Sequence, residues 1–67
     1  MITMVEVRPG WDTTCDLRRY WLCPVDVDGK QVKHEISKVV FYNIMDAVMV
    51  AHNEFGSVSI NSLKALS

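Results

Sequence analysis

The segment from Asn43 to Gly56 constrains the fold of this chain more than any other part of its sequence. Apolar residues recur there at the spacing of one face of an α-helix, namely Ile44, Ala47, Val48, Ala51 and Phe55. Asn43 is a favourable N-cap, Asp46 suits the positive end of a helix, and Gly56 can take the left-handed conformation that ends one. The sequence therefore predicts a helix over residues 43–55 whose apolar face must be covered by another element.

A second strong signal is the pair Asp28-Gly29, which lies between two segments of alternating apolar and polar residues. Such a pair is typical of a two-residue β-hairpin turn. It predicts strands over residues 18–27 and 30–36, with Cys23 opposite His34. In this register one face of the ribbon collects apolar side chains, namely Trp21, Cys23, Val25, Val32 and Ile36.

The rest of the chain supplies further strands. Residues 2–8 are rich in β-prone residues and precede a loop, residues 9–17, that carries Trp11. Residues 57–61 alternate strictly and read as another strand. We therefore expect an α+β fold: a small, three- to four-stranded, mainly antiparallel sheet in the order β, β-hairpin, α, β, with one helix packed on one face. A chain of 67 residues leaves no room for a second core, so residues 1–67 form a single domain.

Composition limits the function classes. The apolar fraction of 49% and the charged fraction of 22% are typical of a globular protein rather than a disordered one. Seven basic and eight acidic residues give a net charge of -1, whereas nucleic-acid-binding domains usually carry a basic excess. No apolar stretch approaches the roughly 20 residues of a membrane span, and no signal peptide is evident. These features predict a cytoplasmic protein that does not contact membranes, with reduced cysteines.

The residues best suited to chemistry are Cys15, Cys23, His34 and His52. They are zinc-ligand types, but they lack the close pairs that let one turn present two ligands. Cys23 and His34 could form a thiolate–imidazole pair as predicted cross-strand neighbours, yet Cys23 would face the core and stay neutral. We therefore expect no catalytic residue, no metal site and no cofactor, and the chain is predicted not to be an enzyme. A zinc-stabilised module is a third alternative, to be tested by metal analysis.

Apolar side chains outside the predicted core are more informative. Met45, Met49 and Val50 are turned away from the helix stripe, Tyr20 and Leu22 lie on the ribbon face opposite Trp21, and Trp11 sits in a loop. Methionine and aromatic residues are enriched at protein interfaces, although a small domain also exposes some apolar surface. We expect a non-catalytic protein-binding module, which includes the case of a homodimer. The predicted partner-binding residues are Trp11, Tyr20, Leu22, Met45 and Met49, with Arg18 and Arg19 steering the approach.

The alternative function is nucleic-acid binding. Arg18 and Arg19 precede Tyr20 and Trp21, which combines positive charge with stacking surfaces. Lys33 would lie on the polar side of the ribbon, and Lys30 and Lys38 could extend the basic patch. Asp26 and Glu35 lie near these basic residues, and their negative charges reduce the positive charge of the patch.

The order of elements resembles that of the small phage-encoded proteins that inhibit the host RNA polymerase. The residues that carry the resemblance are Tyr20-Trp21, the strand from Val32 to Ile36, Asn43, Asp46-Ala47, and Phe55 followed by Val58 and Ile60. The resemblance covers residues 18–63 and implies a short, non-enzymatic inhibitor that occupies a surface of a host protein complex, in the host cytoplasm. The family's final strand carries arginines that are important for polymerase contact, whereas residues 57–63 contain none and Lys64 is the first basic residue.

Overall fold

The computed structural model describes residues 1–66 and shows a small α+β fold. In chain order its elements are β1 (Met4–Asp12), β2 (Leu17–Val25), the 3-10 helix η1 (Glu35–Lys38), α1 (Ile44–Phe55), β3 (Ser59–Asn61) and α2 (Leu63–Leu66). The predicted helix and the predicted last strand are therefore confirmed as elements. Within the described residues, no helix combines the length and the apolar character needed to cross a membrane.

The sheet has three strands in the order β2-β1-β3 and is mixed rather than mainly antiparallel. β1 and β2 form a long antiparallel hairpin, and β3 pairs in parallel with the first residues of β1. The predicted element order was wrong because the hairpin joins β1 to β2 through a turn at residues 13–16. The predicted loop over residues 9–17 is thus mostly strand, and Trp11 belongs to β1.

A turn forms at Asp28-Gly29, but it is wider than the predicted two-residue turn, because the Asp26 N–H donates to the carbonyl of Lys30 and Val25 pairs with Gln31. It also does not join two long strands. Gly29 has a φ of 78°, and the Asp26 carboxylate accepts hydrogen bonds from the backbone of Asp28 and Lys30, each at 2.9 Å. Beyond the turn, pairing with β2 is limited to two isolated bridges, between Val25 and Gln31 and between Tyr20 and Phe41. The predicted strand over residues 30–36 was therefore wrong, because the chain leaves the edge of β2 and winds into η1.

One hydrophobic core lies between the sheet and α1. Val5, Val7 and Leu22 are fully buried there with Ala47 and Ala51 of α1. Partly buried apolar side chains surround them, including Ile44, Val48, Val50, Phe55, Val58 and Ile60. The helical stripe was predicted correctly, whereas Val50 packs against the core instead of facing away from it.

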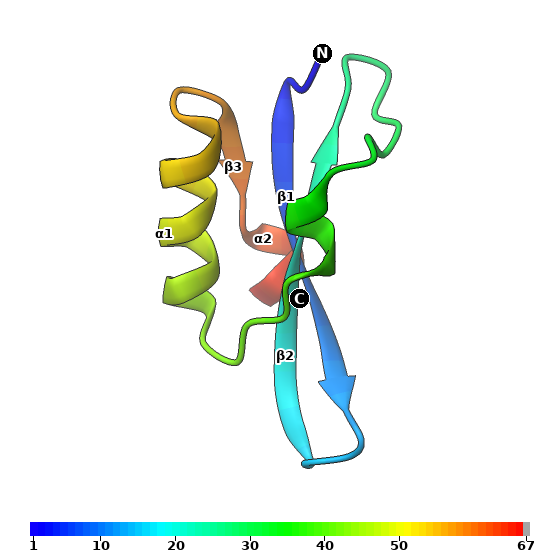
Figure 1. Cartoon of the computed structure of the whole chain (residues 1–67), viewed down its shortest axis with the longest axis vertical. Coiled ribbons are helices and arrows are strands. Elements are labelled where there is room, and N and C mark those ends of the chain that lie inside the picture. Colours follow the sequence, from blue (N-terminus) through cyan, green and yellow to red (C-terminus); the bar gives the residue numbers. More distant parts are fainter. Residues whose placement is uncertain (67) are drawn as a thin grey trace.

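The ends of α1 follow the sequence signals. The Asn43 side chain accepts a hydrogen bond from the backbone of Met45 at 2.8 Å, which caps the first turn. Gly56 ends the helix with a φ of 65°, and its N–H donates to the carbonyl of His52. These two ends place α1 beside one half of the hairpin only (Figure 1).

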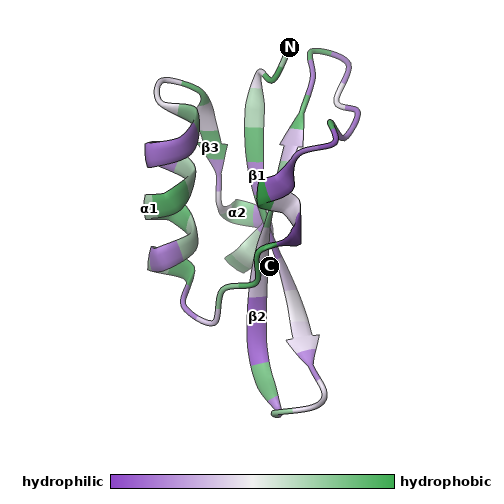
Figure 2. Ribbon diagram, viewed as in Figure 1, coloured by the Kyte–Doolittle hydropathy of each residue, from purple (hydrophilic) through white to green (hydrophobic). Residues whose placement is uncertain are grey.

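The other half of the hairpin projects past the lower end of α1 (Figure 1). Figure 2 shows hydrophobic (green) segments in the strands beside α1, while the projecting part is mainly pale or hydrophilic apart from a hydrophobic segment of β2 near its outer end. We call this projecting part, residues 8–21, the hairpin arm. It holds most of the residues that the sequence singled out for partner binding.

Candidate functional site

Trp11 and Arg18 form the outer end of one face of the hairpin arm. They are Cα partners across the β1–β2 ladder, and Pro9 and Tyr20 are the next pair on the same face. Trp11 is 54% exposed, and its indole N–H donates to the carboxylate of Asp16 at 3.2 Å. This hydrogen bond fixes a large apolar ring beside the turn while leaving half of it open to solvent.

Arg18 connects this face to the body of the domain. Its guanidinium donates to the carbonyl oxygen of Ala65 in α2 at 3.3 Å and lies 6.0 Å from the centre of the Tyr20 ring. A cation held over an aromatic face is favourable and restricts the long side chain. Trp11, Arg18 and Tyr20 therefore form a continuous, ordered strip on one face of the arm.

The opposite face of the arm carries Arg19 and Trp21. The Arg19 guanidinium lies 5.5 Å from the centre of the Trp21 ring. The ring sits directly on Gly10, since a Cβ there would lie 2.5 Å from Cζ3 of Trp21. Trp21 was predicted to face the core together with Cys23, but it is only partly buried and lies on the face away from Leu22.

A polar cluster fixes the outer end of the arm. The Asp12 carboxylate accepts hydrogen bonds from the Thr14 hydroxyl at 2.5 Å, from the Thr14 backbone at 3.1 Å and from the Tyr42 hydroxyl at 2.7 Å. The bonds from Thr14 and Tyr42 lower the pKa of Asp12, and the bond to Asp12 raises the pKa of Tyr42 to about 12. Tyr42 precedes α1, so this contact ties the arm to the chain that enters the helix.

The remaining predicted partner-binding residues lie elsewhere. Leu22 is fully buried in the core, so its predicted place on an exposed surface was wrong. Met45 and Met49 lie one turn apart on α1 and are 63% and 59% exposed, as expected from the helical pattern. These methionines lie on α1 rather than on the hairpin arm, so we treat them as a second exposed surface.

The predicted Cys23–His34 pair is not formed by strand pairing. Cys23 lies opposite Glu6 in the sheet and is buried, and burial raises the pKa of its thiol. His34 caps η1 by accepting a hydrogen bond from the Ile36 backbone at 3.1 Å, and its ring lies 5.1 Å from that of Phe55. Cys15 is an exposed free thiol in the turn of the hairpin. Among the described residues, no group of three acidic, histidine or cysteine side chains is arranged to hold a metal ion.

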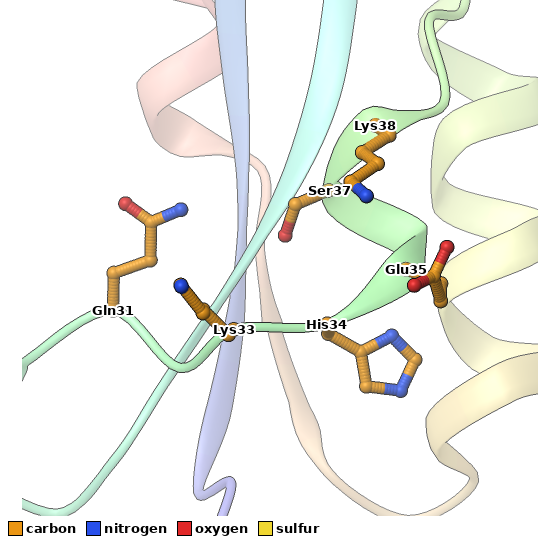
Figure 3. Close-up of a pocket in the computed structure, with 6 residues that line it drawn as sticks. All are labelled: Gln31, Lys33, His34, Glu35, Ser37 and Lys38. Atoms are coloured by element: carbon orange, nitrogen blue, oxygen red, sulfur yellow. The ribbon is translucent and has the colours of Figure 1, made fainter.

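The structure also shows a feature that sequence reasoning missed. Segment 31–38 bounds an open hollow of about 570 Å³. In Figure 3, Gln31, Lys33 and Ser37 extend to one side of this segment, and His34 and Glu35 to the other. The sequence analysis placed Lys33 on a predicted strand and Lys38 at the extension of the same basic patch. No local sequence signal reveals that η1 brings them to one hollow.

Comparisons with protein-family models, with curated proteins and with solved structures find no match for this chain.

Proposed function

We propose that this chain is a non-catalytic protein-binding module that acts sterically, in the manner of the phage-type inhibitors that block a host protein complex. The observation that carries the proposal is the hairpin arm, a projecting element with large apolar side chains at its outer end. Trp11 is 54% exposed and Leu17 is 50% exposed. Exposed tryptophan beside arginine is typical of the residues that dominate protein interfaces.

The arm is also ordered before a partner arrives. Asp12 is held by Thr14 and Tyr42, and Trp11 is held by Asp16. A side chain that is already fixed loses less conformational entropy on binding, so more of its contact energy remains as affinity. This supports the arm as a docking element rather than as a loop that only connects two strands.

Arg18 and Arg19 suit the steering role. They lie on opposite faces of the arm, so the arm presents positive charge on both sides of its apolar end. Charged groups around an apolar centre raise the association rate more than they raise the final affinity. Met45 and Met49 form a separate exposed surface on α1 that can contact the same partner or a second copy of the chain.

The test is capture of partners from bacterial lysate with tagged protein, with and without nuclease. We expect one nuclease-resistant protein partner, and we expect the double variant Trp11→Ala/Arg18→Ala to reduce its recovery by about tenfold or more. Val27→Ala is the matched control, since Val27 is an 82% exposed apolar residue in the turn after β2. Circular dichroism checks that each variant is folded.

Two results would overturn the proposal. Recovery that is equal for the arm variant and the control would remove the arm as the docking element. Partners that disappear on nuclease treatment would instead favour nucleic-acid binding through Arg18, Arg19, Tyr20 and Lys33.

A further inference from the structure

The chain between β2 and α1 crosses the edge of β2 and bounds two adjoining hollows. The larger one, about 570 Å³, is lined by Gln31, Lys33, His34, Glu35, Ser37 and Lys38. The smaller one, about 230 Å³, is lined by Arg19, Trp21, Ser37 and Val40. Ser37 belongs to both walls, so the two hollows meet at η1. We call the combined depression the linker groove.

Positive charge predominates in the linker groove. Arg19, Lys33 and Lys38 line it, and Glu35 is the acidic residue in its wall. The ion pairs found among residues 1–66 join Glu6 to Arg8 and to Lys64, so neither groove lysine is neutralised by a neighbour. Unpaired cations around a depression attract an anionic ligand.

Two residues of the smaller hollow also carry buried polar atoms that lack a partner. Among the described residues, the buried side-chain atoms without a hydrogen bond are Nε of Arg19 and Oγ of Ser37. Both residues line this hollow. A buried polar group without a hydrogen-bond partner costs free energy. A ligand oxygen that reaches such a group after a small side-chain rotation therefore gains more binding free energy than it would at the open surface.

From this arrangement we propose that the linker groove binds an acidic peptide segment of a partner protein. Carboxylates of the peptide pair with Lys33, Lys38 and Arg19, and an apolar side chain of the peptide packs against Val40. This inference rests on the proposed function, since the peptide is part of a protein partner, but it concerns a surface beside the arm rather than its outer end.

A peptide fits the groove better than a nucleic acid does. Single-stranded nucleic acids are bound by stacking bases on exposed aromatic faces along a basic channel. Here the Arg19 guanidinium already lies over the Trp21 ring, and the Arg18 guanidinium lies over the Tyr20 ring. Domains that bind a long phosphate backbone usually carry a basic excess, whereas this chain carries a net charge of -1.

The experiment uses the full chain and a fluorescently labelled peptide of alternating glutamate and leucine, measured by anisotropy at a salt concentration of about 50 mM. The control peptide has glutamine in place of each glutamate. We expect the charge-reversal variant Lys33→Glu/Lys38→Glu to weaken binding of the acidic peptide by about tenfold or more. Lys30→Glu is the control variant, because Lys30 is exposed and lies outside the groove.

The inference is supported if the acidic peptide binds, the glutamine peptide does not, and only the groove variant loses affinity. It is overturned if the wild-type chain does not bind the acidic peptide, if Lys30→Glu is as damaging as the groove variant, or if a labelled oligothymidylate binds more tightly than the peptide. The capture experiment can succeed and depend on the arm while the acidic peptide does not bind. In that case the proposed function is retained and only the assignment of the linker groove is rejected.

Discussion

The two halves of the β1–β2 hairpin share one ladder of backbone pairs but differ in what covers them. In the half beside α1, Val5, Val7 and Leu22 are fully buried. In the hairpin arm, Trp11 and Leu17 remain about half exposed, although they occupy the same two strands. The difference shows that strand pairing extends a rigid element beyond the core, whereas burial requires a second layer. Strand pairing therefore holds the arm in place, while its side chains remain accessible to a partner.

The largest expected effect is the difference in the free energy of unfolding between a variant in the covered half and a variant in the arm. Leu22→Ala removes a fully buried side chain and leaves a cavity beside α1, so we expect it to lower the free energy of unfolding by about 2–4 kcal/mol. Leu17→Ala in the arm removes a side chain of the same type that is 50% exposed, and we expect a loss of about 1 kcal/mol or less. Urea unfolding of both variants measures the difference. Equal losses would show that the arm is as tightly packed as the core.

An intermediate effect tests the packing inside the arm. Gly10→Ala places a methyl group 2.5 Å from Cζ3 of Trp21 and 3.2 Å from Nε of Arg19, so the Trp21 ring must move. We expect a loss of about 1–2 kcal/mol, together with a change in the near-ultraviolet circular dichroism of the tryptophans. Gly10→Ala combined with Trp21→Leu removes the clash and serves as the control. An unchanged spectrum in the single variant would show that the ring does not rest on Gly10.

The smallest effect concerns the contact between the arm and the chain before α1. The neutral Tyr42 phenol donates to the Asp12 carboxylate, which raises the pKa of Tyr42 to about 12 from its ordinary value of 10.0. This contribution to stability is fully present below pH 10 and is lost as the pH rises toward about 12. The lowered pKa of Asp12 adds a contribution that is present above the ordinary value of 3.8 and disappears in stronger acid.

An absorbance titration of the phenols measures this contact, because the chain has only two tyrosines. We expect a phenol transition near pH 12 that vanishes in Tyr42→Phe and moves to lower pH in Asp12→Asn. Tyr20→Phe is the control and should leave that transition in place. A transition that keeps its midpoint in Asp12→Asn would contradict the contact.

The helix was predictable from the sequence because its signals are local. Asn43, the apolar stripe and Gly56 act within α1 itself, and the structure confirms each of them. The hairpin was not predictable in the same way. Asp28-Gly29 is a genuine turn, but the choice of partner for β2 was decided by β1, whose nine residues pair along the whole of β2. The longer ladder formed at the turn over residues 13–16, which the sequence analysis had placed in a loop.

The pairing of β2 with β1 also explains which site residues the sequence placed correctly. Alternation along β2 puts Leu22 and Trp21 on opposite faces in either pairing, so only the identity of the core face was open. The sequence favoured the face with Trp21, and Cys23 and Val25 on that face are buried, but the core beside α1 is formed by the opposite face, where Leu22 lies with Val7. The exposure of Trp11, Met45 and Met49 was anticipated, while the linker groove was not, because it depends on η1 replacing a strand.

The sequence by itself determined the α+β class, the limits of α1 and the presence of a turn at Asp28-Gly29, since each follows from interactions between residues a few positions apart. Only the tertiary structure decided which strand pairs with β2, which of its faces packs against α1, and which residues line the linker groove. These depend on contacts between distant segments. The free energy of these contacts exceeds the local preference of residues 30–36 for a β-strand. A single sequence does not reveal which distant segments will meet.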